Sequence, residues 1–96
     1  MEFTIWDQKG KVRMEKTIYT REYAVLIHLL RVARQQAGLT QVELAKKVGQ
    51  TQSFITKIER GERRLDVVQL RTICQLFGMS FPDFARRFER ELAKRK

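Results

Sequence analysis

Regularly placed glycines are the feature of this sequence that most limits its fold. Beyond about Thr20, each of four glycines follows a short segment whose apolar residues recur at the three- and four-residue spacing of one helical face. Helices commonly end on a residue in the left-handed conformation, which glycine adopts at no steric cost. The four are Gly38, Gly49, Gly61 and Gly78. We therefore expect an all-α domain of five helices, the last one following Gly78.

Capping residues predict where these helices begin. The first is expected from about Thr20 to Ala37, with one apolar stripe made of Tyr23, Ile27, Leu30, Ala33 and Ala37. The later segments are preceded by residues that commonly cap helices, namely Thr40, Thr51, Asp66 and Ser80. Two of these have an acid three residues later, giving the capping-box pattern Thr40/Glu43 and Ser80/Asp83.

The first nineteen residues follow a different pattern. Phe3 and Ile5, then Val12 and Met14, alternate with polar residues on either side of a break at Gly10. This alternation indicates two short strands joined by a turn. We therefore expect an N-terminal β-hairpin-like arm over residues 1–19 and a single helical domain over residues 20–96.

The charge of the chain favours a polyanionic partner. Its formal net charge is +9 and its pI is about 10.3, which is typical of nucleic-acid binding but also allows attraction to a membrane surface. No apolar run approaches the ~20 residues that a membrane span needs, and no secretory leader is evident. A single cysteine, Cys74, fits a reducing cytoplasm, so we expect a cytoplasmic protein with no membrane association.

Residues 41–60 have the pattern of two short helices crossing at a steep angle. Apolar residues at helical spacing form a seam between them: Leu44, Val48, Ile55 and Ile58. Ala45 is small where the second helix must pass close by, and Gly49 lies where the turn needs a positive φ. One helix then serves as a brace, and the next projects from the surface.

Four segments of the chain closely resemble one family. Leu30-Arg-Val-Ala-Arg34, Gly38-Leu-Thr-Gln41, Glu43-Leu-Ala45 and Ile58-Glu-Arg-Gly61 are similar to the lambda-repressor/Cro-type (XRE) helix-turn-helix family. The resemblance spans about residues 23–88, whereas Gln50 departs from the family pattern and residues 1–19 lie outside it. It implies a five-helix lambda-repressor-like DNA-binding domain whose helix-turn-helix covers 41–60.

The resemblance also implies roles for single residues. Gln41 matches a position that contacts a backbone phosphate, and Arg34 with Glu59 matches an ion pair between the first helix and the reading helix. The positions that reach base edges are matched by Gln52, Ser53 and Lys57. Side-chain chemistry agrees, because Gln can pair with adenine, Lys can donate to guanine and Ser can serve either role.

The other expected DNA contacts surround this reading face. Thr51 and the free amides that follow it suit a phosphate, and Thr56 shares a helix face with the base-reading positions. Three arginines follow the reading helix where the chain would run along the DNA backbone: Arg60, Arg63 and Arg64. Double-stranded DNA is therefore the expected ligand of the reading helix at about 52–60.

The sequence gives little sign of any other chemistry. His28 has no second ligand at metal-binding spacing, and Cys74 is expected to be an inert core thiol. We find no nucleophile motif, acid pair or phosphate-cradling loop, so we expect no enzyme activity, no metal and no cofactor. Two alternatives to a regulator remain: an antitoxin that also binds a toxin, and an adaptor that has lost DNA binding.

A second apolar stripe on the first helix suggests self-association. Val25, Leu29 and Val32 are displaced from the buried stripe, and apolar surface on such a domain usually has a partner. The cover could be the arm, with Phe3, Ile5 and Trp6, another subunit, or both together through an exchanged hairpin. We favour the arm and the first helix over the apolar face of the last helix as the surface between subunits. We expect a homodimer that acts as a repressor, binds a palindromic operator and is associated with the nucleoid when bound to DNA.

Overall fold

The computed structural model describes residues 20–94, which form five α-helices and contain no strand. In chain order they are α1 (Arg21–Gln36), α2 (Gln41–Lys47), α3 (Gln52–Glu59), α4 (Val67–Leu76) and α5 (Phe81–Lys94). The expected all-α, five-helix fold is confirmed, with boundaries within a residue or two of those expected. The expected β-hairpin-like arm, with Phe3, Ile5 and Trp6, lies outside the described residues.

The helices begin where their capping residues predict. Thr20, Thr40, Thr51 and Asp66 are N-caps, and each accepts a hydrogen bond from the backbone amide three residues on. The expected box at Thr40 is complete, because the Glu43 carboxylate also accepts from the Thr40 amide at 2.9 Å. A second complete box joins Asp66 to Gln69. At the start of α5 the Ser80 hydroxyl accepts from the Asp83 amide, and the Asp83 carboxylate pairs with Arg86.

Two clusters of buried side chains make the core. The larger one joins α1, α3, α4 and α5 through Tyr23, Ile27, Leu30, Ile58, Leu70, Ile73, Cys74 and Phe84. The smaller one, Leu44, Ala45 and Ile55, lies between α2 and α3. Val48, Phe54 and Phe77 pack against both clusters. The helix pair α2–α3 is therefore fixed to the rest of the domain by continuous apolar packing.

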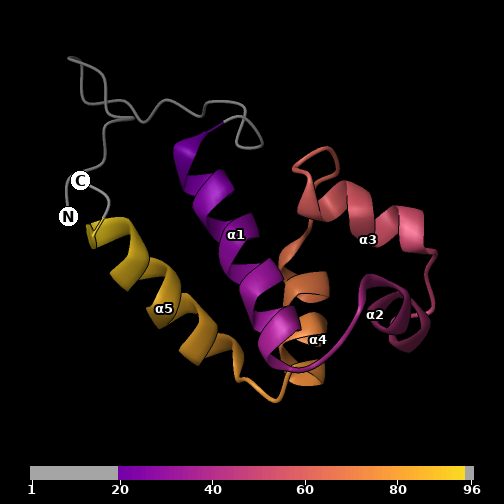
Figure 1. Cartoon of the computed structure of the whole chain (residues 1–96). Coiled ribbons are helices and arrows are strands. Elements are labelled where there is room, and N and C mark those ends of the chain that lie inside the picture. Colours follow the sequence, from indigo (N-terminus) through magenta and orange to yellow (C-terminus); the bar gives the residue numbers. More distant parts are fainter. Residues whose placement is uncertain (1–19, 95–96) are drawn as a thin grey trace.

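Helix α1 lies in the middle of the molecule, with α5 on one side and α2 and α3 on the other (Figure 1). This position explains why the second apolar stripe of α1 offers little free surface. Val25 is only 3% exposed, Leu29 packs against the larger cluster and Val32 is half-buried. Ala37, expected on the buried stripe, is instead exposed, because it is the C-cap of α1.

Candidate nucleic-acid interface

The turn between α2 and α3 fixes the angle at which α3 projects. After the C-cap Val48, the amide of Gln50 donates to the carbonyl of Ala45 at 2.9 Å, and Gly49 has a φ of +69°. A Cβ on Gly49 would meet nothing within 4 Å. The positive φ, and not a lack of space, therefore makes glycine the favoured residue in this turn.

Helix α3 has one buried face and one polar exposed face. Ile55 and Ile58 are each 1% exposed. The side chains of Gln52, Ser53 and Lys57 are exposed. The three residues expected to read base edges therefore share the solvent face of a helix that is anchored on its other side.

The beginning of α3 suits a phosphate. The Thr51 hydroxyl accepts from the Phe54 amide at 3.2 Å, so this polar side chain already caps the helix. The amides of Gln52 and Ser53 belong to the first turn, where an α-helix supplies no acceptor. These two amides, with the positive end of the helix dipole, form the feature that attracts an anion here.

The expected ion pair between Arg34 and Glu59 is present and buried. Arg34 Nε lies 2.7 Å from Glu59 Oε2, and Arg34 Nη2 lies 3.2 Å from Glu59 Oε1. The two residues are 8% and 3% exposed. Arg34 Nη1 also donates to the carbonyl of Leu39 at 2.7 Å. One guanidinium thus connects α1, the loop before α2 and the last turn of α3.

The side chain of Gln41 joins α2 to α3, a role that the sequence did not predict. Gln41 Nε2 donates to Glu59 Oε1 at 3.0 Å, and its Oε1 accepts from the Thr56 hydroxyl at 2.7 Å. Thr56, expected among the exposed DNA contacts, is half-buried and points to α2. Residues 56 and 59 lie on the same side of α3, so one glutamine amide can bond both of them.

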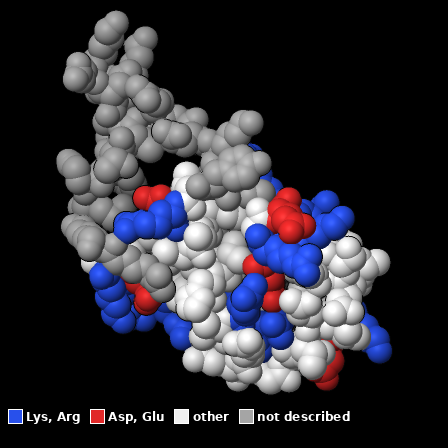
Figure 2. All heavy atoms as spheres, turned by 45° about the horizontal axis from the view of Figure 1, so that its top comes forward, with Lys and Arg blue, Asp and Glu red and all other residues white. Residues whose placement is uncertain are grey.

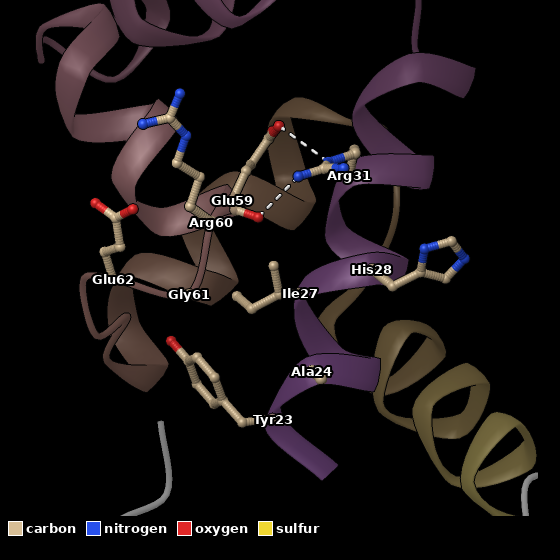
Figure 3. A pocket seen from close by; sticks show the side chains of 9 residues that line it. All are labelled: Tyr23, Ala24, Ile27, His28, Arg31, Glu59, Arg60, Gly61 and Glu62. Carbon is tan, nitrogen blue, oxygen red and sulfur yellow. Dashed lines mark hydrogen bonds and ion pairs between the residues drawn. The ribbon is translucent and has the colours of Figure 1, made fainter. Parts of the chain in front are cut away.

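Arg31 is a further contact to α3 that the sequence did not predict. Its Nη2 donates to the Glu59 carbonyl at 2.9 Å, and its Nε lies 3.6 Å from Glu59 Oε1. The contact closes one end of an open hollow of about 640 Å³ between α1 and the end of α3 (Figure 3). The hollow is lined by Tyr23, Ala24, Ile27, His28, Arg31, Glu59, Arg60, Gly61 and Glu62.

This hollow gives no sign of a bound ligand. Tyr23 and Ile27 point from α1 toward the segment after α3, whereas His28 points away from it (Figure 3). Among residues 20–94, no buried side-chain nitrogen or oxygen lacks a hydrogen-bond partner. The hollow therefore offers a ligand no buried polar atom that lacks a hydrogen-bond partner. It is an open gap between α1 and the segment at the end of α3, which pack against each other.

The arginines after α3 lie near the reading face. The guanidinium of Arg63 is 4.7 Å from the centre of the Phe54 ring, and the Tyr23 hydroxyl donates to the Arg63 carbonyl at 3.5 Å. Phe54 belongs to the first turn of α3, so the loop folds back along that helix. Arg60, Arg63 and Arg64 are all exposed. Figure 2 shows basic side chains at several places on one face, interspersed with fewer acidic ones.

Ionisable groups outside this surface do not suggest a catalytic centre. Burial raises the pKa of the Cys74 thiol to about 11, so the thiol stays protonated and unreactive near neutral pH. Hydrogen bonds from Thr40 hold the pKa of the Glu43 carboxyl below its usual range. His28 is exposed, and no cluster of metal-ligating side chains occurs within the described part of the chain.

None of the helices in residues 20–94 is both long and apolar enough to cross a bilayer.

Comparison with known proteins agrees with this geometry. The profile of the helix-turn-helix family matches residues 30–84, which include all of α2, α3 and α4. The HTH-type transcriptional regulator y4dJ of Sinorhizobium fredii is 36% identical over 47 residues, which make up 49% of this chain and 61% of that regulator. The chain thus spans less than two thirds of the regulator's length.

Two solved structures share the fold over most of their length. An XRE-family-like protein from Pseudomonas syringae pv. tomato is 41% identical, with a TM-score of 0.71 over 79% of this chain and 93% of that one. The wild-type restriction-modification controller protein C.Esp1396I is 25% identical, with a TM-score of 0.71 over 78% of this chain and 97% of that one.

Proposed function

Because the chain belongs to the XRE-type helix-turn-helix family of DNA-binding regulators, we propose that it represses transcription by binding a palindromic operator as a homodimer. The observation that carries the proposal is the exposed polar face of α3. Gln52, Ser53 and Lys57 are exposed on a helix that Ile55, Ile58 and Glu59 hold from behind. Such a helix can enter a major groove without losing its packing.

The surrounding groups supply the phosphate contacts that the proposal needs. The first-turn amides of α3 lie at one end of the reading face and the exposed Arg60 at the other. The exposed Arg63 and Arg64 follow on the loop that returns toward Phe54. Contacts of this kind position the helix on the duplex, whereas the side chains at 52, 53 and 57 distinguish the bases. Gln41 has one amide hydrogen besides the one it donates to Glu59, and this hydrogen remains for the proposed phosphate contact.

Two copies are proposed because one short reading helix contacts only a few base pairs. That is too little free energy to select one site among the competing sites of a genome. Two helices related by a two-fold axis would lie ~34 Å apart in successive major grooves and would require a roughly palindromic site. A regulator of chromosomal DNA would act in the cytoplasm, at the nucleoid.

Selection of bound duplexes from a random pool tests the proposal directly. The enriched sequences should form a palindrome, and inserting that site between a promoter and a reporter gene should lower expression when the protein is present. Gln52→Ala or Lys57→Ala should cost ~1–3 kcal/mol on the best site and relax the preference at one base pair. Arg64→Ala should weaken binding to all sequences about equally.

Arg90→Ala is the matched control, because Arg90 is an exposed base on α5, away from the reading face. It should change neither affinity nor preference by more than the measurement error. If no sequence were enriched, or if Gln52→Ala and Lys57→Ala folded normally and kept the same site preference, the proposed reading face would be wrong. The first result would favour a protein-interaction adaptor.

A further inference from the structure

The turn between α2 and α3 contains one polar side chain that the fold does not use. Val48 packs against both core clusters, Gly49 has no side chain, and the Thr51 hydroxyl caps α3. The side chain of Gln50 is exposed and makes no hydrogen bond to any residue in the described part of the chain. Gln50 therefore contributes to the turn only through its backbone amide, which donates to the Ala45 carbonyl at 2.9 Å.

We propose that Gln50 is a further DNA contact, whose side-chain amide donates to a phosphate of the DNA backbone at the edge of the major groove. The inference rests on the proposed function, to which it adds one residue and one contact in each half-site. Glutamine is among the side chains that commonly donate to phosphate oxygens. Such a bond positions a protein on the duplex and does not distinguish one base pair from another.

The place of Gln50 in the chain favours a phosphate over a base edge. A recognition helix contacts base edges with its first residues, and the two phosphate backbones border the groove that it enters. Here those first residues are Gln52 and Ser53, whereas Gln50 precedes the N-cap and lies outside the helix. The positive φ of Gly49 and the bond to the Ala45 carbonyl fix the backbone at this point. Gln50 is thus held beside the groove when α3 is inside it.

The residue type at position 50 favours a contact with DNA over a role in folding. A hydrophobic residue directly before an N-cap often packs against the fourth residue of the helix, which is Ile55 in α3. Glutamine is a poor choice for that contact, and Gln50 departs from the pattern of the XRE-type family. Ile55 is nevertheless only 1% exposed, so α3 is well packed without it. A leucine at position 50 would serve the fold at least as well.

The substitution Gln50→Leu separates DNA binding from folding. The Tm should stay the same or rise, because leucine can pack against Ile55, whereas affinity for a half-site should fall about 10-fold. The preferred bases should not change, since a phosphate carries no sequence information. Gln75→Leu, at an exposed glutamine near the end of α4, is the matched control and should alter neither affinity nor preference. A Gln50→Leu variant that binds like the wild type, or that prefers different bases, would overturn the inference.

The substitution Gln50→Lys gives an independent measurement. An ammonium group in place of the amide would neutralise the phosphate and release a further counterion. A plot of log affinity against log salt concentration should therefore become steeper by about 0.9 for each bound chain. Gln75→Lys adds the same charge away from the reading face and should leave the slope as it is in the wild type. Equal slopes for the two lysine variants would show that position 50 does not face a phosphate.

Ethylation of single phosphates locates the contact and separates this inference from the proposed function. Ethylating one phosphate in each half-site should weaken binding of the wild type but not of Gln50→Leu, while the other sensitive phosphates should affect both chains. If the wild type bound no DNA, the proposed function and this inference would fail together. If the wild type bound a palindrome and both chains were sensitive to the same phosphates, only the inference about Gln50 would fail.

Discussion

The substitution Glu59→Gln tests whether the buried polar network holds the reading helix. The Glu59 carboxylate accepts from Arg34 at 2.7 and 3.2 Å and from Gln41 at 3.0 Å, and it lies 3.6 Å from Arg31. Glutamine has the same shape but replaces one acceptor oxygen with an NH2 group. That group must face a donor of Arg34 or Gln41, so at least one bond is lost while the Arg34 charge stays buried.

The expected cost follows from these contacts. Removing one partner of a buried ion pair typically destabilises a protein by about 3–5 kcal/mol, because the remaining charge has no compensation. Arg34 keeps its bond to the Leu39 carbonyl at 2.7 Å, which places Glu59→Gln at the lower end, at about 3 kcal/mol. For a domain of this size, a loss of 1 kcal/mol in the free energy of unfolding lowers the Tm by about 4–8 °C. The Tm of Glu59→Gln should therefore fall by roughly 12–24 °C.

Urea denaturation followed by circular dichroism would measure the loss, and a double-mutant cycle would identify its cause. The single variants Arg34→Met and Glu59→Leu should each destabilise by a similar amount, whereas Arg34→Met/Glu59→Leu should cost little more than either of them alone, since well-packed apolar pairs can replace buried ion pairs. The cycle should give a coupling energy of about 2–3 kcal/mol. A Glu59→Gln variant within about 0.5 kcal/mol of the wild type, or a coupling energy near zero, would refute the reasoning.

Three further outcomes follow from the same contacts. If the dimer makes on the order of 6–10 phosphate contacts, its DNA affinity should fall ~10³–10⁵-fold between 50 and 200 mM salt in a fluorescence titration, and a nearly flat response would argue against the proposed DNA contacts. Thr56→Val should cost about 1 kcal/mol in urea denaturation because Gln41 Oε1 loses its donor. Thr72→Val, at an exposed threonine on α4, should lower the free energy of unfolding much less. Equal losses for the two variants would show that the Thr56–Gln41 hydrogen bond does not stabilise the fold. Because burial raises the pKa of Cys74 to about 11, a disulfide reagent at pH 8 should react with the thiol only after unfolding. Rapid stoichiometric reaction of the folded protein would contradict that protection.

The helices could be predicted from the sequence because their determinants are local. A capping threonine and a glycine with positive φ act within a few residues, so Thr40 and Gly49 predicted the limits of α2 from the chain alone. The same reasoning could have found the Asp66/Gln69 box, since glutamine is the other residue that completes such a box. The exposed face of α3 also followed from periodicity, given that Ile55 and Ile58 had to be buried.

The contacts between helices depended on packing that periodicity does not specify. Thr56 has a polar side chain on a short helix, and only the position of α2 determines that it bonds Gln41 and is not fully exposed. Val25 looked uncovered because a helical projection shows which residues share a face but not how many neighbours surround the helix. Helix α1 lies between α5 and α3, so more than one of its faces is buried.

The supporting contacts of α3 explain how so short a helix can serve as a reading element. Isolated helices shorter than ~12–15 residues are marginal in water, and α3 has 8 residues, so its order depends on tertiary contacts. Its cap, its two isoleucines and the network at Glu59 all lie at its ends or on its inner face. None of them involves the side chains at 52, 53 and 57. The stability of the helix and the base contacts proposed for it therefore involve different residues, so the three side chains at 52, 53 and 57 can change while the fold stays the same.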